Sequence, residues 1–235
     1  MKPIIFSTPM VQAILDGRKT MTRRVVTNKY FLQWTDDFAD EFIKDPDNDW
    51  LSLAPYKPGD ILWVRETWRI GAWDGNYSKI AIDYKADNFS RREWIHIDDE
   101  KRFEDYWIQS TDDADKAGID MDENGEYHWK PGEAPTRWRP SIFMPKESAR
   151  IFLKVKNVRV ERIQNMNFYD WQADFCPDIS EQRKALATFS GHSYMKQAMK
   201  NLWDSLNAKR GYSWESNPWV WVIEFERASA DGKEE

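Results

Sequence analysis

Residues 149–160 read ARIFLKVKNVRV, and this stretch decides the fold class because apolar and polar side chains alternate along it. Ile151, Leu153 and Val155 would share one face of an extended chain, and the residues between them would share the other. This two-residue period predicts a β-strand with one buried face. Residues 219–225, WVWVIEF, are rich in the aromatic and β-branched side chains that favour strands, and they predict a second one.

The apolar patterns outside these two strands are short and mixed. They predict strands at 2–6, 61–68 and 80–84, an extended segment at 18–26, and helices at 9–16 and 181–208. The first helix would end at Gly17. The apolar side chains of the second would face the core: Leu186, Met195, Met199, Leu202 and Leu206. Short strands, scattered helices and turn signals indicate an α+β domain built around a small, mostly antiparallel barrel with flanking helices.

The formal net charge of −6 conceals an uneven distribution. Residues 35–49 carry seven acidic side chains and one lysine, and residues 98–126 carry twelve acidic and three basic side chains. We interpret the surrounding segments, 27–54 and 86–135, as two acidic insertions in a single domain that spans residues 1–235. Without the two acid-rich stretches the chain keeps 21 acidic and 30 basic side chains, a balance typical of polyanion binders. An even spread of basic residues over the surface would explain the same balance.

Cysteine content and hydropathy indicate the compartment. The single Cys176 excludes an internal disulfide framework and favours a reducing environment. No run approaches the roughly 20 apolar residues that a membrane helix needs, and the first ten residues do not form a signal peptide. We therefore expect a cytoplasmic protein without membrane contacts. Its oligomeric state does not follow from the sequence.

Several familiar site patterns are missing or incomplete. The chain has no glycine-rich phosphate loop and no serine nucleophile elbow, and its three histidines lack ligand spacing. Residues 120–125 match the first half of a calcium-binding EF-hand loop, but Pro131 stands where the bidentate glutamate belongs. These residues therefore predict an acidic turn around Asn124 and Gly125, and we expect neither a metal nor a cofactor.

The segment 18–24, RKTMTRR, combines four cationic and two hydroxyl side chains in seven residues. Cationic side chains bind phosphates or carbonyls, and hydroxyls donate, accept or attack. On an ideal strand the side chains alternate, with Lys19, Met21 and Arg23 on one face and Thr20, Thr22 and Arg24 on the other. Lys19 could therefore meet Thr22 only if the segment bends or bulges.

Four blocks of the chain, taken in order, resemble the ASCH domain superfamily, and most of all its larger phage and prophage members. The blocks are AILDGRKTMTRR (13–24), YKPGDILWVRETW (56–68), WRPSIFMPKESARIFLKVKNVRVERI (138–163) and NPWVWVIEF (217–225). The resemblance leaves both acidic insertions outside it. It implies a PUA-like β-barrel with a cleft, and a role in RNA or modified-nucleoside metabolism.

The resemblance extends to the N4-acetylcytidine amidohydrolases of this superfamily, whose Lys-Thr-x-Thr-x-Arg motif is matched by Lys19, Thr20, Thr22 and Arg24. It implies that Lys19 is the catalytic base and Thr22 the nucleophile. The catalytic glutamate of the family corresponds to Asp174, which is one methylene shorter.

Four functions are compatible with these residues. The first is a binding module for RNA, DNA or a modified nucleoside, and the second is an amidohydrolase that uses Lys19, Thr22 and Asp174. The third is a metal-dependent single-strand ribonuclease, to whose metal site the acidic residues of the insertions would contribute. The fourth is a protein-interaction role. For the binding module the candidate contacts are Arg18, Thr20, Arg23, Arg24, Glu66, Trp68, Trp138, Arg139 and Ser141.

Each of these contacts has an ordinary structural alternative. Glu66 would equally form a buried salt bridge with Arg65, Arg139 or Arg150. Many of the 14 tryptophans lie beside charged residues, where packing at the edge of a core explains them as well as base stacking does. Trp63, Trp68 and Trp138 are the candidate stacking surfaces.

Overall fold

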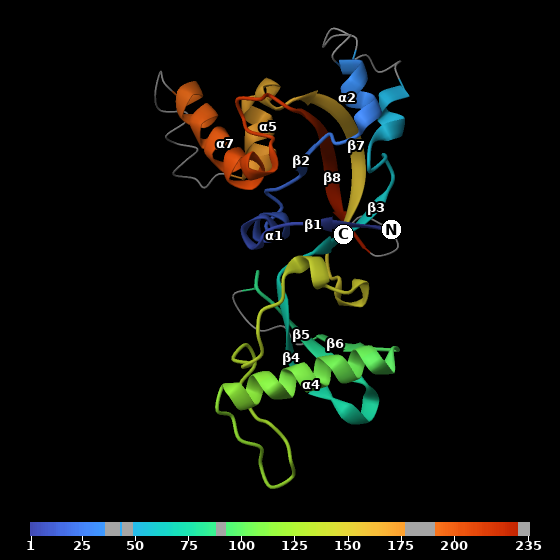
Figure 1. Ribbon diagram of the computed structural model, residues 1–235, viewed down its shortest axis with the longest axis vertical. Coiled ribbons are helices and arrows are strands. Elements are labelled where there is room, and N and C mark those ends of the chain that lie inside the picture. The colour runs from blue at the N-terminus through green and yellow to red at the C-terminus, as the bar shows by residue number, and fades with distance from the viewer. Residues whose placement is uncertain (36–42, 44–48, 88–92, 177–190, 230–235) are drawn as a thin grey trace. The chain divides into compact units, whose positions relative to one another are not determined.

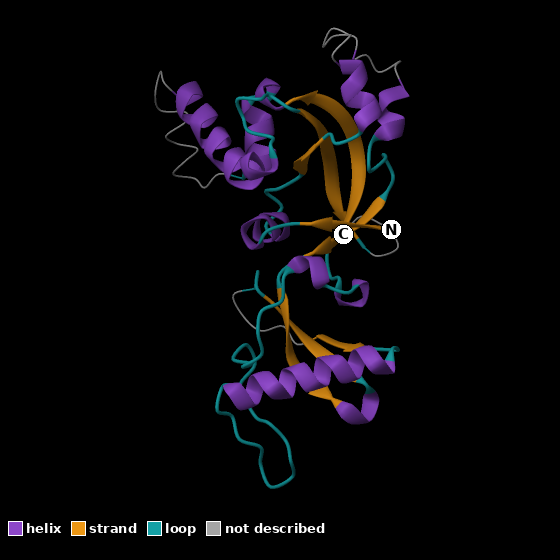
Figure 2. Ribbon diagram, viewed as in Figure 1, coloured by secondary structure: helices purple, strands orange, loops and turns teal. Residues whose placement is uncertain are grey.

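The computed structural model describes residues 1–35, 43, 49–87, 93–176 and 191–229 (Figure 1). The chain divides into two compact units. Unit 1 contains Met1–Lys2, Ala13–Leu62 and Phe152–Glu235, and unit 2 contains Pro3–Gln12 and Trp63–Ile151. Both units combine helices and strands, which confirms the predicted α+β class (Figure 2). The helices formed by the described residues are all too short or too polar to cross a membrane.

Two sheets are present in the described part of the chain. Five strands are hydrogen-bonded in the order β1-β3-β7-β8-β2, and three in the order β4-β5-β6. The five are β1 (Lys2–Ile5), β3 (Ile61–Arg65), β7 (Phe152–Arg162), β8 (Trp219–Ala228) and β2 (Met21–Val25). The boundary between the units passes through β1 and β3. Among the described residues the larger sheet begins at β1 and ends at β2, so the predicted closed barrel stays a prediction.

The strand predicted from residues 149–160 is β7, the longest in the protein's described part, and it pairs antiparallel with β8 from Phe152↔Ala228 to Arg162↔Trp219. A bulge lies between Val155 and Asn157. One extra residue at a bulge shifts the phase of side-chain alternation. This explains why the apolar pattern of the sequence steps from Val155 to Val158.

Helices cover the sheet of unit 1. The helices α5 (Phe168–Phe175) and α7 (Gly191–Asn207) pack with β2 and β8 around a core that includes Met21, Trp171, Met195, Met199, Trp203 and Val222. Phe31 of α2 (Lys29–Thr35) packs instead on Trp219 and Trp221, with ring centroids 5.8 and 5.5 Å away.

The inward stripe of the predicted helix 181–208 is partly confirmed. Residues 181–190, Leu186 among them, lie outside the described residues. Met195 and Met199 are buried as predicted. Leu206 is 50% exposed, so its prediction was wrong, and Trp203 is buried instead. Trp203 continues the four-residue spacing of the two methionines, which keeps it on their face of the helix.

Unit 2 contains the second sheet, formed by β4 (Trp68–Asp74), β5 (Lys79–Tyr84) and β6 (Glu93–His96). All neighbours pair antiparallel. The helix α4 (Glu100–Lys116) buries Phe103, Ser110 and Ala114. A core of eight buried residues holds the unit together: Trp68, Ile70, Ile80, Ile82, Tyr84, Ile97, Phe103 and Met144.

The sequence predictions for unit 2 need two corrections. The single strand predicted at 61–68 is two strands, because β3 ends at Arg65 and β4 begins at Trp68. Within the predicted insertion at 86–135 lie β6 and α4, which were not predicted. The organisation as one domain with insertions stays a prediction.

Short 3-10 helices complete the described elements. They are η1 (Asp49–Leu53), η2 (Gly75–Tyr77), η3 (Ser141–Phe143), η4 (Lys146–Ser148), η5 (Ile163–Asn165) and η6 (Ala208–Arg210). The remaining α-helix is α1 (Thr8–Leu15), as predicted from residues 9–16.

Candidate functional site

The turn after α1 directs the cationic segment into β2. Gly17 adopts the left-handed conformation with φ 72°, as its predicted place after the helix requires. The backbone N–H groups of Arg18 and Lys19 both donate to the carbonyl of Ala13, at 2.8 and 3.0 Å. The chain then enters β2, which pairs with β8 from Met21↔Glu224 to Val25↔Val220.

Lys19 is buried against α5 and contacts Asp174. Its Nζ donates to the Met21 carbonyl at 2.7 Å, to the Asp174 carboxylate at 2.7 Å and to the Asp174 carbonyl. The side chains of Lys19 and Asp174 are 0% and 8% exposed. These three acceptors match in number the three N–H donors of an ammonium group. Two residues of the predicted triad, 155 positions apart, are therefore in direct contact.

Arg23 shares the Asp174 carboxylate and binds two more. Its guanidinium lies 3.1 Å from Asp174, 2.8 Å from Asp170 and 2.7 Å from Glu161. Burial alone would lower the pKa of Arg23, but the charges of Asp174, Glu161 and Asp170 outweigh burial and raise it. The positive charge of Arg23 is therefore neutralised inside unit 1.

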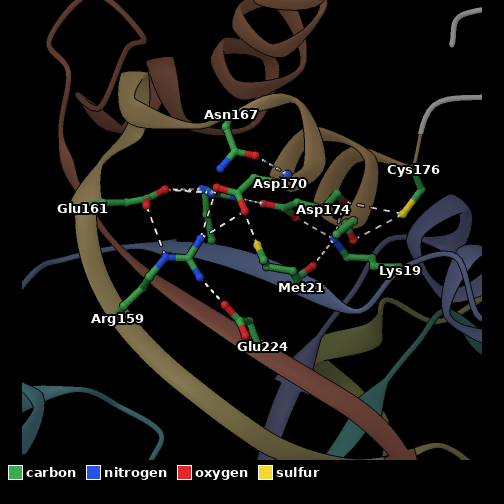
Figure 3. Close-up of polar contacts among 11 residues, drawn as sticks. Lys19, Met21, Arg159, Glu161, Asn167, Asp170, Asp174, Cys176 and Glu224 are labelled. Atoms are coloured by element: carbon green, nitrogen blue, oxygen red, sulfur yellow. Dashed lines mark hydrogen bonds and ion pairs between the residues drawn. The ribbon is translucent and has the colours of Figure 1, made fainter.

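Arg159 extends these contacts toward the surface. Its guanidinium lies 3.1 Å from Asp170 and 3.4 Å from Glu161, and it also pairs with Glu224. Its side chain is 33% exposed. We call the set Lys19, Arg23, Arg159, Glu161, Asp170, Asp174 and Glu224 the charge network; Figure 3 shows its labelled members turned toward one another between α5 and the sheet.

Arg159, Glu161 and Asp170 were not predicted, although local spacing marks them. Asp170 and Asp174 are four residues apart and share one face of α5. Arg159 and Glu161 are two residues apart and share one face of β7. What the sequence does not contain is the pairing of these two faces.

Thr22 lies on the other face of β2. Its cross-strand partner is Ile223, and the register from Met21 to Val25 advances one residue at a time. Side-chain alternation therefore directs Thr22 away from Met21 and Arg23. The bend that would bring Thr22 toward Lys19 is not found within β2, and the nucleophilic role of Thr22 stays a prediction.

The remaining predicted residues of this segment are more accessible. Arg18 has a side chain 45% exposed, pairs with Asp16 at 2.8 Å and donates to the Cys176 carbonyl at 3.2 Å. Thr20 is exposed, and its N–H donates to the Ala173 carbonyl at 3.2 Å.

Arg24 differs from Arg23 in its electrostatic surroundings. Burial lowers the pKa of Arg24; the charges of Tyr56 and Asp174 oppose this, and the neighbouring Arg210 adds the smallest, lowering effect. A lowered arginine pKa means that nearby negative charge does not fully compensate for desolvation. The pKa values of the two neighbouring arginines therefore shift in opposite directions, upward for Arg23 and downward for Arg24.

The predicted contact residues after position 60 belong to unit 2. Glu66 is 1% exposed, and Arg150 binds both of its carboxylate oxygens at 2.9 Å. Arg150 also binds Asp87 at 2.7 Å and lies 3.9 Å from the ring centre of Tyr84. Of the three salt-bridge partners considered for Glu66, Arg150 is the one present.

The candidate stacking surfaces are mostly buried. Trp63 is 5% exposed and Trp68 is 0% exposed, with Arg139 lying 5.4 Å from the Trp68 ring centre. Trp138 is 37% exposed, and Arg69 lies 4.5 Å from its ring centre. Ser141 is half-buried. Among these residues Trp138 keeps the most accessible ring.

One further cluster was not predicted. Oxygen and nitrogen ligand atoms of Asp122, Glu126 and His128 all lie within 4.8 Å of one another. The predicted turn explains this approach: the Gly125 N–H donates to the Asp122 carbonyl at 3.0 Å, and Gly125 has φ 79°. His128 Nε2 lies 2.9 Å from Asp122, and this hydrogen bond helps lower the pKa of Asp122 to about 2. The group is largely exposed, and exposed acidic turns are common without a metal.

No protein-family model matches the chain, and no curated protein or solved structure matches it either. The ASCH resemblance therefore rests on the four sequence blocks, and the roles that it implies are proposals.

Proposed function

We propose that the chain binds RNA or a modified nucleoside through Arg18, Thr20 and Arg24. The observation that supports this proposal best is the exposure of Arg18 and Thr20 beside the buried charge network. Three carboxylates neutralise Arg23, whereas the side chain of Arg18 is 45% exposed and Thr20 is exposed. A phosphate or an anionic nucleoside group would contact these two side chains first, with Arg24 further along the same segment.

The geometry of the segment also suits a polyanion. β2 is the last strand in the order of its sheet, and the charge network anchors its inward side chains to α5. These contacts hold the segment in place, and Lys19 and Arg23 can keep their carboxylate partners while a ligand binds. Arginine pairs with phosphate through two parallel hydrogen bonds, and threonine hydroxyls donate to phosphate or base oxygens.

Fluorescence anisotropy with a labelled single-stranded RNA tests the proposal. We expect affinity to fall as salt rises, and Arg24→Gln to reduce the slope of that dependence by about 1, as the loss of one phosphate contact does. Arg227→Gln, at an exposed position of β8, is the matched control and leaves the slope unchanged. Equal binding by wild type and Arg24→Gln, or no binding to RNA, DNA or nucleosides, would refute the proposal.

An amidohydrolase is the second candidate, supported by the 2.7 Å contact between Lys19 and Asp174. In this reaction Thr22 would attack the acetyl carbonyl, Lys19 would take the hydroxyl proton, and Asp174 would pass that same proton from Lys19 to the leaving cytidine amine. Water would then release acetate from Thr22. Two features rank this candidate second: Lys19 Nζ already donates to three acceptors, and Thr22 lies on the opposite face of β2.

Incubation with N4-acetylcytidine, followed by chromatography and mass spectrometry of released cytidine, tests this second candidate. Thr22→Val removes the hydroxyl and leaves the charge network intact, so turnover should disappear without unfolding. Wild-type protein that releases no cytidine at high enzyme concentration would exclude the amidohydrolase and leave the binding proposal standing.

A further inference from the structure

A hollow of about 700 Å³ lies in unit 2, and none of the residues of the proposed function lines it. It is lined by the end of β4, one face of α4 and residues 121–129. A volume of this size is in the range that accommodates a small molecule. Five aromatic rings contribute to its wall: Trp73, Trp94, Trp107, Tyr127 and Trp129.

Three of these rings form one continuous surface. The ring centre of Trp73 lies 5.3 Å from that of Trp129 and 5.9 Å from that of Tyr127. Hydrogen bonds fix two of them, because Trp129 Nε1 donates to the Gly71 carbonyl at 2.7 Å and the Tyr127 hydroxyl donates to Asp115 at 2.5 Å. The wall is therefore ordered before any ligand binds.

The other two rings are unusually accessible. Trp94 is 47% exposed and Trp107 is 46% exposed. Exposed aromatic side chains that gather around one hollow mark a binding surface more often than isolated ones do.

The charge of the hollow is negative. Asp74, Asp115 and Glu126 line it, and among the described lining residues the only basic side chain is that of His128. A phosphate-containing ligand would be repelled here, so this site is distinct from the proposed nucleic-acid contacts.

The five pocket rings also differ from one group of aromatic rings in the described part of the chain. In that group an internal cation lies over the ring: Trp63, Trp68, Tyr77, Tyr84, Tyr106, Trp138 and Trp219. No such pair within the described part of the chain involves the five pocket rings. Within the described residues no internal cation therefore competes for the electron-rich faces of these rings.

We propose that this hollow binds the positively charged head group of a small organic cation, of the quaternary ammonium type. Aromatic faces attract such a group through the ring quadrupole, and they do not demand the hydrogen bonds that it cannot donate. The three carboxylates add long-range attraction. A free quaternary amine and a trimethylated lysine side chain share this head group.

Titration with choline, followed by tryptophan fluorescence and calorimetry, tests the proposal. The matched ligand is 3,3-dimethylbutan-1-ol, which has the shape of choline without its charge. We expect choline to bind roughly ten times more tightly than the alcohol. A peptide with trimethyllysine, compared with its unmodified form, distinguishes a protein partner from a free amine. Equal affinity for choline and the alcohol, or preference for a neutral sugar, would overturn the proposal.

Variants locate the binding. Trp107→Leu should weaken choline binding about five-fold or more, and Trp107→Phe should restore much of it, because a second aromatic ring replaces the first. Asp115→Asn removes a charge while keeping an acceptor for Tyr127. Tyr30→Ala, at a 73% exposed ring of α2, is the control and leaves binding unchanged. Unaltered binding in Trp107→Leu and Asp115→Asn would place choline elsewhere and overturn the site.

Discussion

Asp174 in unit 1 and Arg150 in unit 2 are buried to the same degree, each with a side chain 8% exposed. They are electrostatic opposites. Asp174 is an anion between two cations, Lys19 and Arg23, and Arg150 is a cation between two anions, Glu66 and Asp87. Removal of either centre takes the shared partner from two like charges, although Arg23 keeps its contacts with Glu161 and Asp170.

The two clusters differ in whether the charges that remain after removal of the centre can be neutralised by protonation. Carboxylates become neutral by binding protons in mildly acidic solution, whereas a guanidinium keeps its proton at every accessible pH. Loss of Arg150 should therefore cost little folding stability at low pH, whereas loss of Asp174 should cost as much at low pH as at neutral pH. Equal burial and equal pairing do not make two charge clusters equivalent.

Asp174→Ala should produce the largest loss of stability. It leaves Lys19 and Arg23 without the carboxylate that they share, and breaking a buried pair in this way costs about 3–5 kcal/mol. Urea unfolding measures the loss, and we expect no recovery at pH 5. Asp16→Ala removes the exposed partner of Arg18 and is the control, at about 0–1 kcal/mol. Similar losses in the two variants would show that the charge network contributes little.

Arg150→Met should cost a comparable amount at pH 8, about 3–5 kcal/mol, but much less at pH 5. Burial already raises the pKa of Glu66 even though Arg150 opposes it, so loss of Arg150 raises this pKa further. A raised carboxyl pKa means that the folded state binds more protons, and stability then falls as pH rises above the ordinary value of about 4.5. Adding Glu66→Gln should flatten this dependence, and identical stability at pH 5 and pH 8 would contradict it.

The two clusters were not equally predictable from the sequence. The alternation of Lys19, Met21 and Arg23 follows from the two-residue period of a strand, and the structure agrees. The Lys19–Asp174 contact was expected only through the family resemblance, because no local pattern connects residues 155 positions apart. For Glu66 three arginine partners were possible, and only tertiary packing selects Arg150.

The helix α4 shows why other elements were missed. Its acidic side chains dominate the composition of residues 100–116, and its buried residues are few: Phe103, Ser110 and Ala114. One of them is a serine, so the apolar stripe is hard to recognise. The hollow lined by Trp73, Trp107 and Trp129 was missed for a different reason, because these residues come from three separate elements.

Gly71→Ala should disturb a third buried pair, Arg69 and Asp83, by steric means rather than by charge. A Cβ atom at Gly71 would lie 2.4 Å from Asp83 Oδ1, and Asp83 also pairs with Arg69 at 3.1 Å. We expect a loss of about 1–3 kcal/mol, typical of overpacking. Gly75→Ala is the control, since no atom lies within 4 Å of the added carbon. A neutral Gly71→Ala would mean that Asp83 can move without losing Arg69.

Asp122→Asn should have the smallest effect on stability, because the Asp122–His128 pair is exposed. The hydrogen bond from Asp122 raises the pKa of His128 above its ordinary value of 6.5, and the variant should return it toward that value. Proton NMR of the imidazole measures the shift, and Asp98→Asn, beside His96, should leave His128 unchanged.

The exposed Asp122–His128 pair and the buried clusters also differ in how folding stability depends on pH. A histidine with a raised folded-state pKa contributes stability that is fully present below 6.5 and is lost as pH rises through the raised value. Arg150→Met also loses stability with rising pH, but above about 4.5 and by a large amount. Solvent screens the exposed pair, so its hydrogen bond moves a pKa visibly while the unfolding midpoint hardly changes. A clear change of that midpoint in Asp122→Asn would contradict the view that burial, rather than pairing, sets the energetic weight of each cluster.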